Sequence, residues 1–193
     1  LIALGRTEAA QQAYDASIRV DSGLAAVRFN RGALLETIND LNGARSDYER
    51  AAALDPNYVE PRASLAWLDA RAGNAVSAQE QGERALALSP SNVLARMALA
   101  SASLQQGDFA IAAAGFSALR QDPAISPVNR SMVLRLTGDL LHAEGQSAEA
   151  YAAYEASNDL LKSIYAAQFA APGMETALGH TRRLAKWFAT AAV

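Results

Sequence analysis

The sequence contains no cysteine among its 193 residues. This absence excludes disulfides, thiolate metal ligands and a cysteine nucleophile. The only histidines, His142 and His180, lack the H-E-x-x-H spacing of a zinc site. Serines, acids and bases are scattered, and no glycine-rich elbow is present to expose a nucleophile. We therefore expect no metal, no cofactor and no catalytic activity.

Long apolar runs and strong charge are also lacking. No apolar stretch approaches the length of a membrane-spanning helix, and no signal peptide is visible. The net charge is −3, whereas a nucleic-acid-binding protein normally presents a basic face. We therefore expect neither membrane insertion nor a nucleic-acid partner. A cytoplasmic location is expected, with the periplasm as the alternative if an upstream signal peptide has been removed.

What the sequence has in abundance is alanine, arranged in repeats. The segment 73–90 is one amphipathic helix between a glycine and a proline, with the small residue Ala78 at its centre. Equivalent alanines recur at a constant spacing, and a fifth follows after a longer interval: Ala10, Ala44, Ala78, Ala112 and Ala150. The extra residues of this last interval fall in the loop 121–127. A fixed period is typical of stacked helical units, each of which contacts its neighbours.

Glycine, proline and the amphipathic pattern predict the helices. The segment 1–22 is expected to hold the end of one helix, a turn at Gly5 and a second helix. Further helices are expected over 25–38, from the turn 39–42 to 54, from 57 to 71, from 74 to the proline at 90, and over 93–106, 109–120, 127–142, about 147–169 and 174–193.

Several residues are suited to the ends of these helices. Asn57 with Glu60 fits an N-cap and its reciprocal acid, and Asn74 fits the next N-cap. Gly73 fits a left-handed C-cap. The pair Ser126–Pro127 combines an N-cap with a proline at the first helical position.

The units resemble tetratricopeptide repeats, in which a small residue in the first helix is followed by alanine and an aromatic residue in the second. The small residues are Gly32, Ala66, Ala100 and Gly138, and the pairs are Ala44 with Tyr48, Ala112 with Phe116, and Ala150 with Tyr154. Prolines Pro56 and Pro90 close two units. The resemblance implies an all-α, right-handed α-solenoid: a repeat array over 1–165 of about five units, the first incomplete, and a capping or linker helix over 166–193.

Two features depart from the family pattern. Gly82 stands where the aromatic residue is expected, which predicts a loosely packed unit. Arg28, Arg62 and Arg96 recur at a position that is often aromatic. We expect them to form a solvated or locally ion-paired stripe.

The resemblance implies a non-catalytic scaffold that binds a protein or peptide in a concave groove lined by the first helices. Carried over by position, the groove residues are Phe29, Ala33, Glu36, Ala63, Trp67, Arg71, Met97, Ser101, Leu104, Arg135, Asp139 and His142. The lysines with which some family members clamp a terminal carboxylate are absent from these positions. Aromatic and methionine contacts instead favour an apolar or amphipathic segment.

Two other functions stay open. The segment 151–162, with the later Lys186-Trp187-Phe188, resembles the junction at which such repeats precede a bacterial sulfotransferase domain, which implies an accessory module for substrate orientation or dimerisation. An envelope assembly scaffold is the third possibility. The apolar stripe of Leu184, Trp187, Phe188 and Ala191 predicts that the last helix caps the final repeat.

Overall fold

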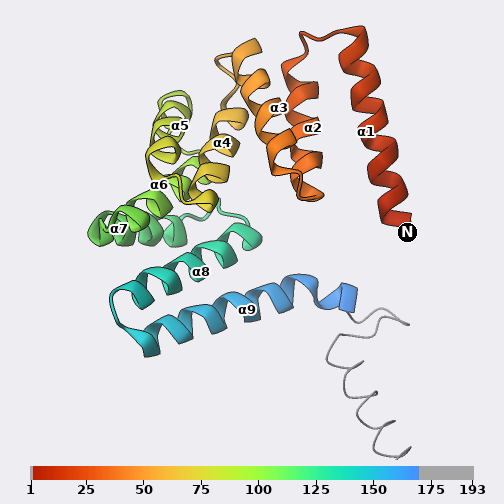
Figure 1. Cartoon of the computed structure of the whole chain (residues 1–193). Helices are drawn as coiled ribbons and strands as arrows, with labels where there is room; N and C mark the ends of the chain where they lie inside the picture. The colour runs from red at the N-terminus through yellow and green to blue at the C-terminus, as the bar shows by residue number, and fades with distance from the viewer. Residues whose placement is uncertain (1, 170–193) are drawn as a thin grey trace, which may run out of the picture.

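The computed structural model describes residues 2–169, which form nine α-helices and no strand (Figure 1). The helices are α1 (Ile2–Val20), α2 (Ala25–Thr37), α3 (Leu41–Leu54), α4 (Val59–Ala72), α5 (Ala75–Leu88), α6 (Val93–Gln106), α7 (Phe109–Gln121), α8 (Pro127–Ala143) and α9 (Ser147–Phe169). Each of the pairs α2–α3, α4–α5, α6–α7 and α8–α9 packs as a hairpin, and α1 packs on α2. The expected all-α, right-handed solenoid is confirmed.

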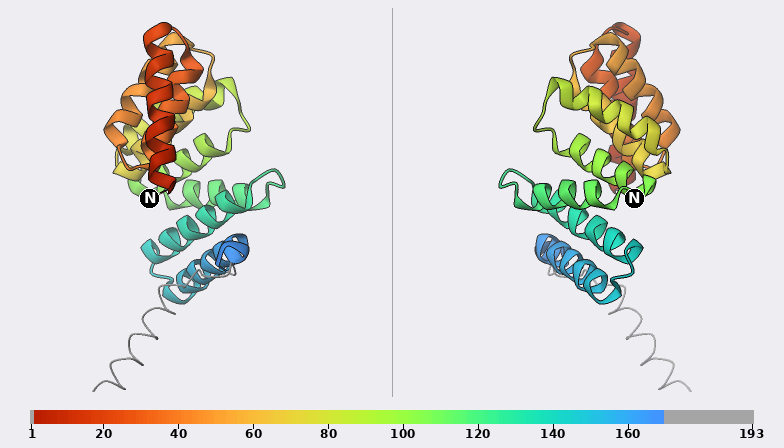
Figure 2. Two further views of the ribbon diagram at one scale, coloured as in Figure 1. Left: turned by 90° about the vertical axis from the view of Figure 1, so that its right-hand side faces the viewer. Right: turned by 90° about the vertical axis from the view of Figure 1, so that its left-hand side faces the viewer.

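The hairpins follow one another along a single stack (Figure 2). The first helices α4, α6 and α8 contact each other in turn, whereas the second helices α5 and α7 lie on either side of α6. First helices therefore form one side of the stack, which we call the concave side. Second helices form the other, which we call the convex side.

The helix ends agree with most of the sequence predictions. Gly73 and Gly107 adopt left-handed φ angles of 82° and 84° at the ends of α4 and α6. The Ser126 side chain accepts a hydrogen bond from the Asn129 amide at 3.2 Å, and Pro127 begins α8. The α9 helix continues past residue 165 to Phe169. The capping helix expected from residue 174 lies outside the described residues.

Two predictions of local structure were wrong. The α1 helix runs through Gly5 without a turn. Asn57 does not cap α4, because the helix begins one residue later than expected, after Tyr58. The backbone amide of Asn57 donates a hydrogen bond to the Asp55 carboxylate. Asn74 occupies the N-cap position of α5, but its side chain makes no capping hydrogen bond.

Close contacts at small residues set the spacing of the helices. The repeated Ala44, Ala78 and Ala112 have no exposed surface. At Gly32, a Cβ atom would lie 2.7 Å from the Tyr48 ring, and at Gly138 it would lie 2.5 Å from the Tyr154 ring. In these two units the aromatic ring of the second helix therefore occupies the space where a side chain of the first helix would otherwise be.

The unit with Gly82 is not loosely packed, so that prediction was also wrong. Gly82 is buried, and a Cβ atom there would lie 2.9 Å from the Leu99 side chain of the following unit. Leu99 thus fills the space that an aromatic side chain at position 82 would take. In this unit the large side chain therefore belongs to α6 and not to α5, and the interface between the two helices is closed.

We predict that Ala112→Leu lowers the free energy of unfolding by about 1–3 kcal/mol, because a closed interface has no room for the larger side chain. Chemical denaturation measures the change. Ala110→Leu is the matched control, because Ala110 lies on the same helix but is exposed, and it should leave stability within about 0.5 kcal/mol of wild type. Equal midpoints for the two variants would contradict the close contact.

We further predict that the effect of Gly32→Ala depends on Tyr48. In the wild type the added methyl group meets the ring and destabilises the fold, although alanine favours a helix over glycine by up to about 1 kcal/mol. In a Tyr48→Leu background only the helix preference should remain, so Gly32→Ala should stabilise. A double-mutant cycle measures the coupling, and purely additive effects would refute the contact.

Candidate functional site

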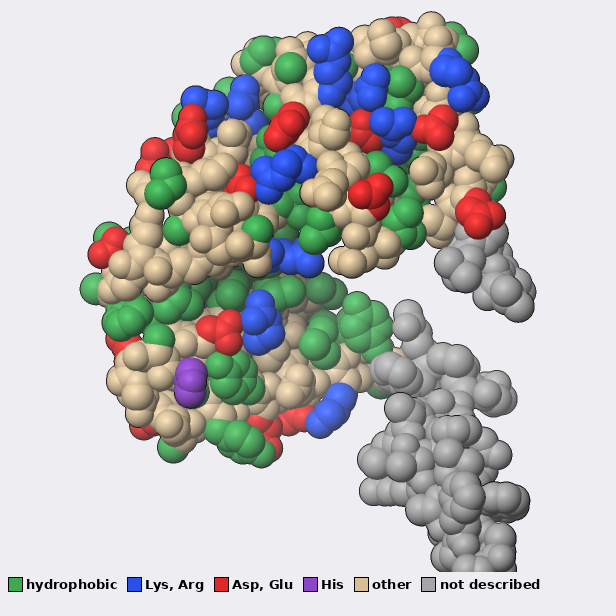
Figure 3. Space-filling model, viewed as in Figure 1, with side chains coloured by type: hydrophobic (Ala, Val, Ile, Leu, Met, Phe, Trp, Pro, Cys, Tyr) green, Lys and Arg blue, Asp and Glu red, His purple; other side chains and the backbone are tan. Residues whose placement is uncertain are grey.

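A hollow of about 380 Å³ lies on the concave side between α4, α6 and α8. It is lined by Trp67, Ala70, Arg71, Ser101, Leu104, Gln105, Arg135, Leu136 and Asp139. We call this set the concave groove. Figure 3 shows the surface indented between the upper helices and the layer formed by α8 and α9.

The concave groove has an apolar floor and a charged rim. Trp67 and Leu136 are buried in the core with 9% and 6% of their surface exposed, so only the edges of these side chains form the floor. Arg71 and Arg135 are about half exposed, at 45% and 46% for their side chains. Both guanidinium groups can therefore meet a ligand from solvent.

Each rim arginine is held by a carboxylate that a tyrosine also holds. Arg71 lies 2.9 Å from Glu36, whose other oxygen accepts a hydrogen bond of 3.0 Å from the Tyr48 hydroxyl. Arg135 lies 2.9 Å from Asp139. The other oxygen of Asp139 accepts a hydrogen bond of 2.9 Å from the Tyr154 hydroxyl on α9, so this arrangement matches the one around Glu36. These bonds fix the rim charges relative to the helices.

The phenol of Tyr48 is shielded from water. Burial raises its pKa above the ordinary value of 10.0, and the negative charge of Glu36 raises it further. Burial and the hydrogen bond to Asp139 likewise raise the pKa of Tyr154. Both hydroxyls therefore stay protonated at neutral pH and act as donors.

The structure brings together six of the predicted groove residues: Trp67, Arg71, Ser101, Leu104, Arg135 and Asp139. The Ser101 hydroxyl donates to the Met97 carbonyl oxygen. Glu36 lies beyond the rim and reaches it through Arg71.

Other predicted positions lie elsewhere. Met97 is 1% exposed and packs in the core, so its expected groove contact was wrong. His142 is exposed but does not line the concave groove. Phe29 packs against Tyr48 and Tyr58, with ring centroids 5.6 and 5.3 Å apart. With Ala63, Phe29 lines a separate hollow of about 240 Å³.

Three lining residues were missed from the sequence: Ala70, Gln105 and Leu136. The Gln105 amide donates to the Ala70 carbonyl oxygen at 2.5 Å and thereby links α6 to α4 across the groove. Helical spacing could have indicated two of them, because Ala70 and Gln105 follow Trp67 and Ser101 by three and four positions.

The arginine stripe is locally ion-paired at two of its three positions. Arg28 lies 3.3 Å from Asp47, and Arg96 lies 2.5 Å from Asp122. Asp47 is 2% exposed and also binds Arg31 at 2.6 Å. The pairs therefore tie helices together and do not offer free cations to a ligand.

A second buried carboxylate, Asp69, joins three helices. It accepts from Arg45 of α3 at 2.5 Å and from Ser77 of α5 at 2.6 Å. Because both partners satisfy the carboxylate, Asp69 is a structural group. The sequence pattern gave no sign of this bridge.

Within residues 2–169, no group of three or more His, Cys, Asp or Glu side chains is arranged to hold a metal ion. In the same part of the chain, none of the helices combines the length and apolar character needed to cross a bilayer.

Residues 25–58, which contain α2 and α3, match the tetratricopeptide repeat family. The chain folds as a tetratricopeptide-repeat solenoid. A comparison with curated proteins gives no match.

Several solved structures share this tetratricopeptide-repeat fold. MamA is 17% identical, with 84% of this chain and 92% of MamA covered and a TM-score of 0.62. A tetratricopeptide repeat protein from Parabacteroides merdae is 19% identical, with 86% and 67% covered and a TM-score of 0.67. YrrB, a repeat protein with an unusual peptide-binding site, is 16% identical, with 87% of each chain covered and a TM-score of 0.59.

We predict that the solenoid loses stability at alkaline pH partly through Tyr48. Folding raises the pKa of Tyr48, so above about pH 10 the unfolded chain releases the phenol proton before the folded chain does. The contribution of Tyr48 to the free energy of unfolding is therefore complete below about pH 10 and declines as the pH rises further. The free energy of unfolding should therefore fall less steeply above about pH 10 in Tyr48→Phe, by at most about 1.4 kcal/mol per pH unit. Parallel curves for wild type and variant would contradict the burial of this phenol.

Proposed function

We propose that the concave groove binds an amphipathic segment of a partner protein. An apolar side chain of the partner lies on the floor formed by Trp67 and Leu136, and a carboxylate of the partner pairs with Arg71 or Arg135. The observation that carries this proposal is the meeting of a buried aromatic floor and two half-exposed arginines in one hollow. Aromatic residues and arginine dominate the energetics of protein interfaces.

A single hollow is too small to hold such a segment alone. Burial of one apolar side chain contributes about 1.5–3 kcal/mol, which is far from the roughly 8 kcal/mol of a micromolar complex. The hollow at Phe29 and Ala63 offers a second anchor, because it lies toward the start of α4 and α6 while the concave groove lies toward their ends.

The helix geometry gives the spacing of the two anchors. Ala63 and Arg71 are eight positions apart on α4, which corresponds to roughly 12 Å along the helix axis. An extended peptide covers this length with about four residues. We therefore propose that the partner presents two apolar side chains about four residues apart, with an acidic residue beside the one on Trp67.

Residues 2–169 provide no observation that favours an accessory role beside a sulfotransferase or a role in envelope assembly. These alternatives and the cytoplasmic location stay predictions.

A phage-displayed library of short random peptides, selected on the full chain, tests the proposal. We expect enriched peptides to carry paired apolar residues and Asp or Glu. Fluorescence anisotropy then compares the affinity of one enriched peptide for wild type, Arg71→Ala and Arg135→Ala. Each variant should weaken binding by about fivefold or more, because a charge-assisted contact is lost.

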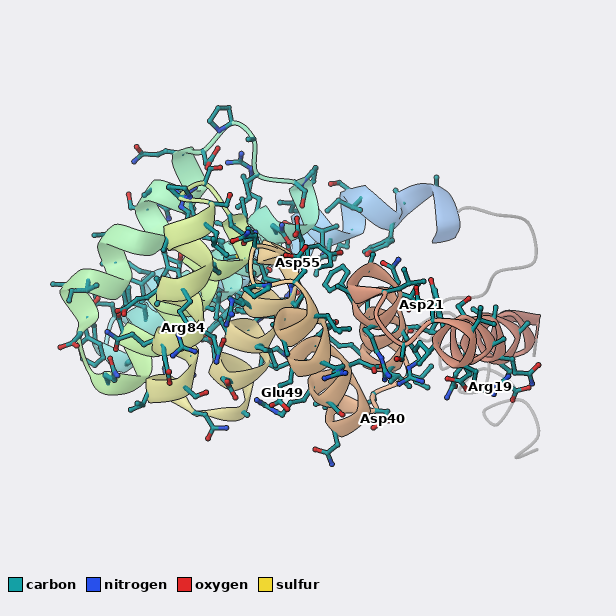
Figure 4. The ribbon with its side chains drawn as sticks, turned by 90° about the horizontal axis from the view of Figure 1, so that it is seen from above. Arg19, Asp21, Asp40, Glu49, Asp55 and Arg84 are labelled. Carbon is teal, nitrogen blue, oxygen red and sulfur yellow. The ribbon has the colours of Figure 1, made fainter. Side chains whose placement is uncertain are left out.

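The matched control is Arg84→Ala. Arg84 is exposed on α5, away from the concave groove, and pairs with Glu80 at 2.6 Å (Figure 4). This change should alter affinity by less than about twofold. Enrichment of basic peptides, or equal affinity for all four proteins, would refute a role for the rim arginines.

A further inference from the structure

A second set of hollows lies on the convex side, between α5 and α7. Two hollows of about 170 and 240 Å³ share Leu99, Ser103 and Ile111 in their linings and therefore adjoin each other. We call this feature the convex groove. Its floor is α6, which packs against both α5 and α7.

One end of the convex groove is mainly apolar. Leu86 of α5 and Ala118 of α7 line it together with the shared Leu99 and Ile111. Arg96, the one cation in this lining, is paired with Asp122 at 2.5 Å. Ile111 is 62% exposed, a large apolar surface for a residue at the edge of a hollow. Covering this end would remove Ile111 and the side of Leu99 from water, which is favourable.

The other end is acidic and has no cation in its lining. Glu83 and Asp108 line it, and neither forms an ion pair with any described residue. Glu83 accepts a hydrogen bond of 2.9 Å from Gln79, which in turn accepts one of 3.4 Å from Gln106 of α6. The amides hold the Glu83 carboxylate in place without neutralising it.

We infer that the convex groove is a second docking surface, for a partner segment in which an apolar side chain is adjacent to Lys or Arg. The apolar side chain lies against Leu99 and Ile111, and the cation lies between Glu83 and Asp108. Charge complementarity determines this chemistry, because two uncompensated carboxylates adjoin an apolar hollow. The surface is separate from the concave groove and has the opposite charge preference, so the scaffold can hold two different partners at once.

Three synthetic peptides provide the test: Gly-Ser-Leu-Ile-Lys-Arg-Ser-Gly, a version with Glu-Glu in place of Lys-Arg, and a version with Ser-Ser in place of Leu-Ile. Each is titrated into the ¹⁵N-labelled full chain while amide signals are followed by NMR. We expect the first peptide to shift the signals of Leu99, Ser103 and Ile111 and to bind at least about fivefold more tightly than the other two.

Surface variants separate this groove from other sites. Ile111→Ser should weaken the first peptide by about fivefold or more, whereas Val76→Ser, which removes a 78% exposed side chain of α5 outside the groove, should change affinity by less than about twofold. Glu83→Lys should favour the Glu-Glu peptide instead. Equal affinity for the three peptides, no shifts up to about 1 mM, shifts at Trp67 and Leu104 in place of Ile111, or association of the chain with itself through this face would each overturn the inference.

Discussion

The close approach of first and second helices at small residues is the constraint on which the rest of the structure depends. Gly32 and Gly138 admit tyrosine rings that would otherwise collide with a Cβ atom. The alanines at the centres of α3, α5 and α7 are fully buried, and Gly82 meets the Leu99 side chain of the following hairpin. Since each hairpin is placed by these contacts, the distance between α4, α6 and α8 is fixed as well, and with it the width of the concave groove.

The same tyrosines link packing to the proposed site. The Tyr48 hydroxyl donates to Glu36, and Glu36 pairs with Arg71 on the rim. A ring that fills the core thus also orients a charge at the surface through two short contacts. At the other side of the groove, the Tyr154 hydroxyl donates to Asp139, which pairs with Arg135. Stability and recognition therefore share residues, and a change in the repeat positions is expected to affect both.

Much of the fold could be predicted because the same residue pattern recurs in each unit. The constant spacing of the units located the central alanines, and glycine and proline located most helix ends. Gly82 was misinterpreted, because its compensation by Leu99 comes from a different position of the next unit and leaves no periodic signal. The bridges at Asp47 and Asp69 were missed for a similar reason, since neither carboxylate recurs at the equivalent position of the next unit.

The site was predicted in part. The positions carried over from the family resemblance put Trp67, Arg71, Leu104, Arg135 and Asp139 in one groove, and they line one hollow. A repeat position does not determine depth, so Met97, which shares the repeat position of Arg135, was expected at the surface although it is buried. The convex groove was not predicted at all, because it forms between two hairpins, and a sequence pattern describes each helix separately.

Hydrogen–deuterium exchange of the full chain, with and without a peptide selected from the random library, tests the concave groove most directly. Amides of a surface that a ligand covers open less often and exchange more slowly. We expect slower exchange in α4, α6 and α8, around Trp67, Leu104 and Arg135. Slower exchange confined to the convex helices α3, α5 and α7, with α4, α6 and α8 unchanged, would contradict the assignment of the concave groove as the peptide site.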